Sequence, residues 1–270
     1  MLNWSSKHIQ TNGIQLHYYQ TRGDLPTIIL VHGITDNGLC WTRLANYLMG
    51  YYDVIMVDAR GHGCSDTPSS GYSKFDHAQD LAGLIEALEL NQPHMIGHSM
   101  GASNVASLAA NYPHLMGRII LEDPPWFTEM DVTDQQRKVR RDNWQQSMIE
   151  TQAKSIQEIM DSGRQRNPTW DAIEMEAWAS SKKQFQLEAF GFIDDPFNWQ
   201  EDVKRIKSPT LLLTSDTELG GIVSPETAER ARAINNNFQV GHITSAGHSI
   251  RREQFDKYVA SVNSFLALPI

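Results

Sequence analysis

The sequence lacks several features that would point to particular classes of protein. Its 270 residues include only two cysteines, Cys40 and Cys64, with neither a C-x-x-C pair nor a disulfide framework, so we expect two buried thiols in a reducing cytoplasm. The formal net charge is −9, which argues against a nucleic acid or an anionic membrane as partner, because both favour basic surfaces. No hydrophobic run approaches the roughly 18 residues of a membrane span. The first residues also lack the apolar segment of a signal peptide.

Signals for cofactors are absent as well. The chain contains no glycine-rich phosphate loop, no dinucleotide fingerprint and no residue cluster with metal-ligand spacing, so we predict neither a cofactor nor a metal. It has no internal repeat and no low-complexity segment. We therefore predict a cytoplasmic protein that acts on a small molecule. The sequence does not indicate its oligomeric state.

What is present is a pattern typical of an α/β protein. Short hydrophobic runs alternate with helical patterns, which indicates a mostly parallel sheet covered by helices on both faces. The predicted strands are residues 14–19, 27–31, 53–57, 93–96, 118–121, 210–214 and 238–243, the first of them antiparallel. The predicted helices are residues 76–89, 102–111 and 252–266.

One connection is much longer than the others. The chain from Leu121 to Thr210 is far longer than a crossover between parallel strands requires. Its composition is helical and polar, with many Trp, Gln and Met residues, and prolines mark both of its ends. We predict an α/β core of residues 1–123 and 209–270, with residues 124–208 forming a helical cap over the sheet.

The pentapeptide Gly97-His98-Ser99-Met100-Gly101 is the strongest motif for chemistry. G-x-S-x-G is short enough to occur by chance, but here it follows a buried strand and opens a helix rich in small residues. Such a strand-to-helix turn needs glycines because bulky neighbours do not fit, and it raises the serine hydroxyl above the sheet. The N-terminus of the helix points its N–H groups at the same place. We predict Ser99 as a nucleophile.

Together with three other segments, this motif carries a family resemblance. The segments are Val31 to Ile34, Asp58 to Ser65, and Ala246 to His248. With them the sequence resembles the α/β-hydrolase superfamily over essentially its whole length, and it looks closest to small bacterial esterases, lactonases and carbon–carbon hydrolases. The resemblance implies the α/β-hydrolase fold, a mostly parallel central sheet with helices on both faces and a helical cap. It is far more specific for the fold than for the substrate.

The resemblance also implies an oxyanion hole. In this family one N–H comes from the residue after His-Gly and another from the residue after the nucleophile, which here are Ile34 and Met100. Two such donors stabilise the charge that develops on a tetrahedral intermediate. A glycine at position 33 lets the backbone approach a substrate carbonyl. We interpret the His32 side chain as structural.

His248 is the predicted base. It lies between the last core strand and the last helix, in a loop of small residues that can present an imidazole to Ser99. A neutral imidazole takes the serine proton and later delivers it to the leaving group. The neighbour of the nucleophile, His98, is interpreted as packing.

The sequence leaves three carboxylates open as the acid that orients His248. In the resembled family the acid usually follows the penultimate core strand, three residues beyond a glycine, but Ser215 replaces that glycine here. Strict register then selects Glu218, and a shortened loop selects Asp216. Some relatives, including certain lactone hydrolases and dehalogenases, place the acid after the strand that follows the nucleophile's helix. That position is Asp123, which lies 24 residues past Ser99 as in those relatives.

Aromatic residues of the predicted cap are candidates for the pocket walls. Trp126 and Phe127 come just after Asp123 and are the first choice, with Phe190, Phe192 and Trp199 as weaker ones. The basic run from Arg137 to Arg141 is interpreted as a solvated helix face.

These residues predict a serine hydrolase that cleaves a carboxylic ester or lactone through an acyl-enzyme, with N-acyl homoserine lactones as one possible class. One alternative is hydrolysis of a carbon–carbon bond in a diketone-type acid, which would want cationic groups in the pocket that the sequence does not place. Another is a catalytically silent receptor for a small molecule. Epoxide hydrolases and haloalkane dehalogenases are disfavoured because they have Asp at the position of Ser99.

Overall fold

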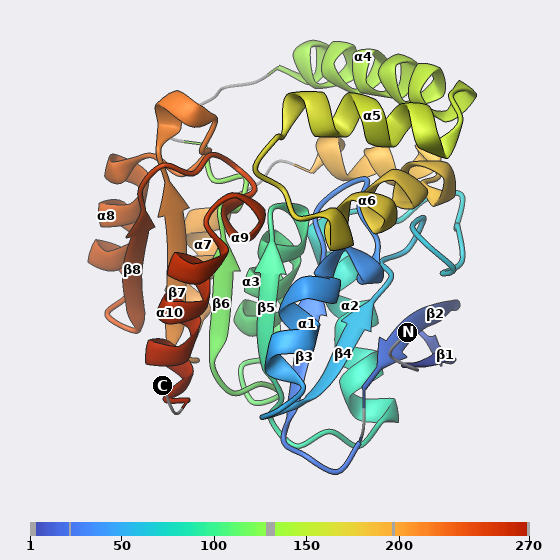
Figure 1. The fold of residues 1–270 in the computed structure, drawn as a ribbon. Coiled ribbons are helices and arrows are strands. Elements are labelled where there is room, and N and C mark those ends of the chain that lie inside the picture. The colour runs from blue at the N-terminus through green and yellow to red at the C-terminus, as the bar shows by residue number, and fades with distance from the viewer. Residues whose placement is uncertain (1–3, 22, 128–132, 196–197, 269–270) are drawn as a thin grey trace.

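A computed structural model describes residues 4–21, 23–127, 133–195 and 198–268 of the chain. Within them the backbone forms an eight-stranded sheet in the order β1-β2-β4-β3-β5-β6-β7-β8 (Figure 1). The strands are β1 (Ser5–Thr11), β2 (Ile14–Gln20), β3 (Thr27–Val31), β4 (Asp53–Val57), β5 (His94–His98), β6 (Ile119–Glu122), β7 (Thr210–Ser215) and β8 (Phe238–Ile243). Strands β3 to β8 run parallel to one another, whereas β1 pairs antiparallel with β2 and β2 antiparallel with β4.

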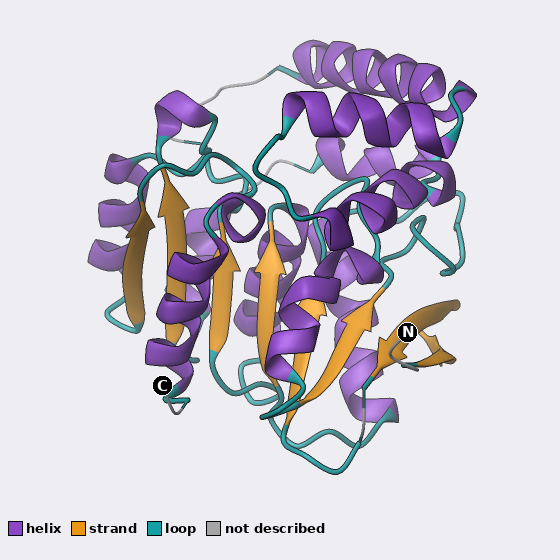
Figure 2. Ribbon diagram, in the orientation of Figure 1, coloured by secondary structure: helices purple, strands orange, loops and turns teal. Residues whose placement is uncertain are grey.

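This architecture confirms the predicted fold class of a mostly parallel sheet with helices on both faces (Figure 2). One face carries α1 (Thr42–Leu48), α9 (Ile250–Glu253) and α10 (Phe255–Leu266). The other face carries α2 (Lys74–Ala87), α3 (Met100–Asn111), α7 (Trp199–Arg205) and α8 (Pro225–Ile234). The edge strand β1 is not predicted from the sequence because most of its residues are exposed and give no alternating hydrophobic signal.

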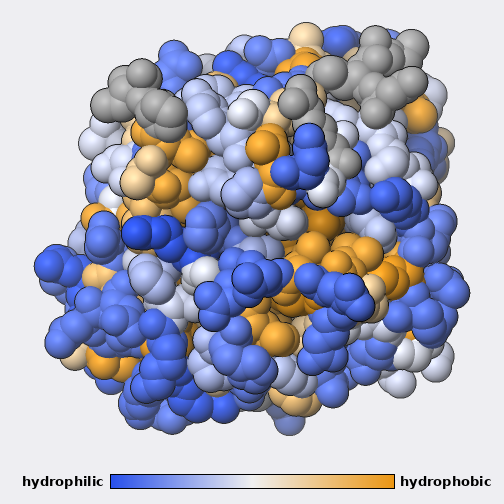
Figure 3. All heavy atoms as spheres, turned by 90° about the horizontal axis from the view of Figure 1, so that it is seen from below, coloured by the Kyte–Doolittle hydropathy of each residue, from blue (hydrophilic) through white to orange (hydrophobic). Residues whose placement is uncertain are grey.

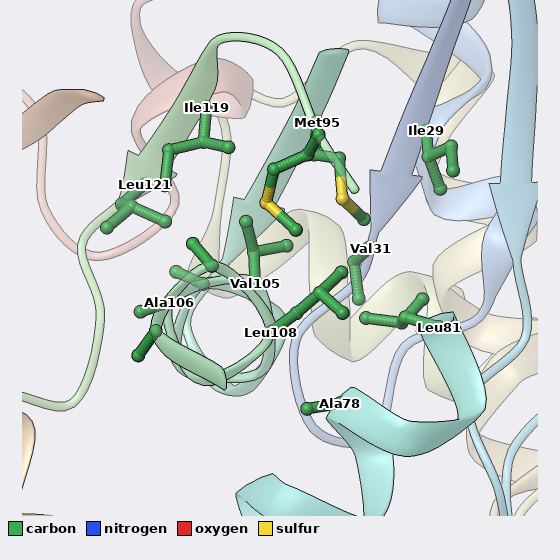
Figure 4. Close-up of a cluster of buried hydrophobic side chains, with 14 of the residues drawn as sticks. Ile29, Val31, Ala78, Leu81, Met95, Val105, Ala106, Leu108, Ile119 and Leu121 are labelled. Carbon is green, nitrogen blue, oxygen red and sulfur yellow. The ribbon is translucent and has the colours of Figure 1, made fainter. Parts of the chain in front are cut away.

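The buried strands place successive side chains on opposite faces of the sheet, as the pleat requires. In β3, Ile29 and Val31 join the cluster under α2 and α3, whereas Ile28 and Leu30 join the cluster under α1 and α10. Figure 4 shows the first of these clusters, in which side chains of β3, β5 and β6 pack against α2 and α3. This double-sided burial fixes the register of β5 and β6, the two strands that lead into the site described below.

The long connection between β6 and β7 folds mainly into helices above the carboxyl ends of the strands (Figure 1). They are α4 (Asp134–Ala153), α5 (Ile156–Arg166), α6 (Ala172–Gln184) and the 3-10 helix η2 (Leu187–Asp194). Two of them begin with reciprocal capping boxes, Thr133 with Gln136 and Ser155 with Glu158, which satisfy backbone N–H groups at the helix starts. Although α7 lies within the predicted cap segment 124–208, it packs against α3 and so covers the sheet.

The surface away from the cap is mainly hydrophilic, with smaller hydrophobic areas, when the molecule is viewed from the opposite end (Figure 3). None of the helices in the described part of the chain combines the length and apolarity needed to cross a membrane. Both cysteines are free thiols, and Cys40 is buried. The prediction of a buried thiol is wrong for Cys64, which is exposed in the loop after β4.

Candidate active site

Ser99 occupies a sharp turn between β5 and α3. Its backbone has φ 52° and ψ −119°, a conformation that is strained for any residue with a side chain, and its N–H donates to the Glu122 carbonyl at 2.9 Å. Both glycines of the motif are required by space. A Cβ on Gly101 would lie 2.1 Å from the Val31 carbonyl oxygen, and a Cβ on Gly97 would lie 2.5 Å from the Gly101 carbonyl oxygen. The turn therefore has the geometry that the sequence predicts.

A cavity of about 410 Å³ opens above this turn. Ser99, His248, Ile34 and Met100 all line it, so the structure brings together the predicted nucleophile, base and oxyanion residues. Met100 is the first residue of α3, where backbone N–H groups have no partner within the helix. The cavity therefore has a hydroxyl and a helix N-terminus at its floor.

The Asp123 carboxylate lies directly beside His248. Its Oδ2 accepts a hydrogen bond from His248 Nδ1 at 2.7 Å. The same carboxylate accepts backbone N–H groups from Ile222 and Val223, each at 2.9 Å. Asp123 is fully buried and has φ 43°, an uncommon conformation for a non-glycine residue. Bonding by three donors keeps this buried carboxylate in one orientation toward the imidazole.

The other two candidate acids point elsewhere. Asp216 accepts the Ser245 N–H at 2.8 Å and His242 Nε2 at 3.0 Å. The Ser245 N–H and the His242 side chain together hold the pKa of Asp216 below its ordinary value. Glu218 is exposed in the short helix η3 (Thr217–Leu219). In the described structure neither carboxylate contacts His248, so the geometry favours Asp123 among the three alternatives.

His98 has a role at this site that sequence reasoning missed. Its Nε2 donates to the backbone carbonyl of His248 at 2.9 Å, and the two rings lie 4.7 Å apart. Burial drives the pKa of His98 well below its ordinary value, so the ring is neutral. A Cβ on Gly33 would lie 2.8 Å from its other ring nitrogen. His98 thus lies between the loop after β3 and the loop of His248. No local sequence pattern predicts these contacts.

Aromatic side chains form much of the cavity wall. Its aromatic lining residues all come from the predicted cap segment and are Phe127, Trp144, Trp170, Trp178 and Phe192.

Trp126, the other predicted wall residue, is in the core instead. It is 1% exposed, and its ring stacks on Trp199 with the centroids 5.1 Å apart. The reason is the turn at Pro124, where the Trp126 N–H donates to the Pro124 carbonyl at 2.7 Å and the indole packs toward Phe238 of β8.

Among the described residues, three cationic side chains also line the cavity: Arg140, Lys182 and Arg252. Lys182 and Arg252 are buried and paired with carboxylates. The Arg140 guanidinium lies 5.9 Å from the centre of the Phe127 ring, and no described carboxylate pairs with it. Arg140 therefore departs from the interpretation of its basic run as a solvated helix face.

Among the residues that the structure describes, one group has side chains close enough together to hold a metal ion. His17, Asp58 and Cys64 place one possible ligand atom each within 4.8 Å of one another. The Asp58 carboxylate already accepts His17 Nδ1 at 2.8 Å and two backbone N–H groups, from Gly38 at 2.7 Å and Cys64 at 2.9 Å. None of the three residues lines the cavity. The hydrogen bond from the Cys64 N–H to Asp58 holds the loop after β4.

Comparison with known proteins agrees with this fold. Residues 26–250 match the family described as the alpha/beta hydrolase fold. The chain is 27% identical over 268 residues, 97% of each chain, to an N-formylmaleamate deformylase of Pseudomonas putida.

Two solved structures have the same fold. The N-formylmaleamic acid deformylase of Pseudomonas putida S16 superimposes with a TM-score of 0.80 at 22% identity, covering 96% of this chain and 100% of that one. The enol-lactonase of Burkholderia xenovorans LB400 gives a TM-score of 0.77 at 19% identity, covering 97% of this chain and 100% of that one. The chain belongs to the α/β-hydrolase-fold family.

Proposed function

We propose that the protein is a serine hydrolase that cleaves a carboxylic ester or lactone through an acyl-enzyme. The observation that carries the proposal is the hydrogen bond between Asp123 and His248 at the cavity that Ser99 lines. A buried carboxylate on Nδ1 leaves the second nitrogen of the imidazole as the base. N-acyl homoserine lactones are one class that fits a cavity lined by aromatic rings.

In this mechanism the Ser99 hydroxyl attacks the carbonyl carbon while His248 takes its proton. Asp123 stabilises the imidazolium that forms, and the amides of Ile34 and Met100 stabilise the oxyanion. The C–O bond then breaks, and His248 gives the proton to the departing alkoxide, leaving an ester on Ser99. Water, deprotonated by His248, attacks this ester and releases the carboxylic acid, which restores the serine hydroxyl.

A second candidate is hydrolysis of an amide or carbon–carbon bond in a small carboxylic acid. The observation that favours it is Arg140, a cavity-lining guanidinium without a described carboxylate partner. Guanidinium groups bind carboxylates through paired hydrogen bonds, so Arg140 can hold an anionic substrate. The name N-formylmaleamate deformylase, borne by the relative reported above, denotes an anionic amide as substrate. The same Ser99 machinery serves both candidates.

A substrate panel tests both. We expect wild-type protein to hydrolyse p-nitrophenyl acetate or N-hexanoyl homoserine lactone, and Ser99→Ala to lose turnover while remaining folded. N-formylmaleamate probes the second candidate, for which Arg140→Gln should raise KM at least about tenfold without affecting p-nitrophenyl acetate. Arg137→Gln on the same helix is the matched control. If no substrate is turned over and a fluorophosphonate does not label Ser99, the hydrolase proposal fails in favour of the silent receptor.

A further inference from the structure

Helix α6 of the cap binds the loop that follows β3 through two nearby side chains. The Lys182 ammonium donates to both the backbone carbonyl and the hydroxyl of Thr35, each at 2.9 Å. Two residues further along the helix, Gln184 accepts the side-chain amide of Asn37 at 2.7 Å. The loop that carries Ile34 is therefore held from above by the cap.

Thr35 has a conformation that needs such support. Its φ is 67°, in the left-handed region that a β-branched residue rarely adopts. Residues in this region keep their conformation only when their surroundings fix it. Besides Lys182, the Ser181 hydroxyl lies 2.9 Å from the Thr35 carbonyl oxygen and 2.8 Å from the Trp178 carbonyl oxygen, so two consecutive residues of α6 lie against the strained residue. Because Thr35 follows Ile34 directly, fixing the backbone of Thr35 also restricts Ile34, whose N–H is the predicted oxyanion donor.

Buried ion pairs extend this attachment to the loop of the base. Asp36 accepts Lys182 at 3.2 Å and Arg252 at 2.9 Å, and Arg252 also donates to Glu174 of α6 at 2.7 Å. All four side chains are buried. Burial alone would raise the pKa of Asp36, but Arg252 and Lys182 hold it well below its ordinary value, so the carboxylate stays ionised. Arg252 lies four residues past His248.

We propose that Lys182 is a positioning residue, which holds the oxyanion loop from the cap by fixing Thr35 and thereby aims the Ile34 N–H at the substrate carbonyl. The proposal rests on the serine mechanism above, in which Ile34 supplies an oxyanion donor. Under this proposal the contact between α6 and Thr35 keeps the oxyanion hole in its active geometry. The cap then affects kcat as well as the shape of the pocket. Lys182 acts through the loop and need not touch the substrate.

The matched pair Lys182→Met and Lys183→Met tests this role. Both lysines lie on α6, but Lys183 donates to the Gln152 carbonyl away from the cavity. With p-nitrophenyl acetate we expect Lys182→Met to lower kcat about 10–100-fold with KM changed less than about threefold, somewhat less than complete loss of an oxyanion donor. Inhibition by a trifluoromethyl ketone, whose adduct on Ser99 carries an oxyanion, should weaken by the same factor. Lys182→Arg should recover part of both, and Lys183→Met should match wild type.

Hydrogen exchange of the Ile34 amide gives a readout that does not depend on turnover. In protein labelled with ¹⁵N-isoleucine, the Ile34 resonance is identified by its absence in Ile34→Val. We expect faster exchange or a shifted resonance in Lys182→Met and no change in Lys183→Met. An unchanged kcat in Lys182→Met, or a lower kcat with an unchanged Ile34 amide, overturns the proposal.

Ser181→Ala covers the case in which Lys182→Met does not fold. This variant removes only a hydroxyl, and we expect a several-fold lower kcat, an unchanged KM and the same change at the Ile34 amide. Wild-type values of all three overturn the proposal. Failure of the serine mechanism itself looks different, because wild-type protein would then show no turnover while the Ile34 amide still responds to Lys182→Met.

Discussion

Strands β6 and β7 are neighbours in the sheet, and the residues that follow them serve the cavity in opposite ways. After β6, Asp123 directs a buried carboxylate at His248. After β7, the chain directs backbone N–H groups at Asp123, from Ile222 and Val223, while its own Asp216 turns outward to His242. The loop after β7 thus contributes donors to an acid that the neighbouring strand supplies. An acidic residue at the position where the family usually carries its acid, such as Asp216, therefore need not be the residue that contacts the base.

The largest expected effect comes from removing the carboxylate after β6. Asp123→Asn should lower kcat for any substrate that the protein turns over by about 10³–10⁴-fold, because the amide NH₂ faces His248 Nδ1 and favours the wrong tautomer. The measurement is kcat with the fold verified by circular dichroism. The opposite result would contradict this assignment of the acid: Asp216→Asn or Glu218→Gln lowering kcat by this factor while Asp123→Asn keeps the wild-type kcat.

Glu122, the last residue of β6, should affect stability more than chemistry. Its carboxylate accepts the Arg251 backbone N–H at 3.0 Å and the Arg251 guanidinium at 3.3 Å, and both side chains are fully buried. Breaking a buried pair leaves an uncompensated charge, so Glu122→Gln should lower the free energy of unfolding by about 3–5 kcal/mol in urea titrations.

The control for this variant is Glu229→Gln, which removes an exposed pair with Arg232 and should cost less than about 1 kcal/mol. Equal unfolding midpoints for the two variants would show that the buried pair at the end of β6 contributes nothing special.

The smallest effect is expected after β7. Asp216→Asn should change kcat less than about twofold, since its carboxylate contacts His242 and Ser245 and not His248. Because the Ser245 N–H and His242 lower the pKa of Asp216 from 3.8, its stabilising contribution is present above that pH and disappears as the pH falls through the folded pKa. The urea midpoint of the variant should therefore lie slightly below wild type at pH 7 and approach it at pH 3. A difference that grows toward pH 3 contradicts this assignment.

Sequence reasoning succeeds where the signal is local. The turn at Ser99 is specified within five residues, because glycine is the only residue type that fits at positions 97 and 101. The buried strands are predicted because they are short hydrophobic runs, and β1 is missed because its residues are mostly exposed. His248 is singled out by its loop between β8 and α9.

Prediction from the sequence fails where a residue's role depends on contacts between distant segments. The three carboxylates could not be separated because the choice depends on which of two adjacent loops turns inward, and the left-handed backbone at Asp123 has no sequence signature. Trp126 and Phe127 are adjacent and equally aromatic, yet only Phe127 faces the cavity, since the turn at Pro124 rotates the chain between them. From the sequence alone, Arg140 cannot be told apart from the other basic residues of its run.

The amide bonds to Asp123 have a consequence for how the chain reaches its native state. Asp123 is separated from Ile222 and Val223 by 99 and 100 residues, and from His248 by 125, so each bond closes a long loop that contains the entire cap. Loop-closure entropy makes such contacts slow to form, whereas the contacts that hold the turn at Ser99, with Val31 and Glu122, close shorter loops that do not contain the cap. We therefore expect the turn of the nucleophile to form before the bonds to its acid. A folding intermediate with a formed sheet and an undocked cap would present a serine that has no means of being activated.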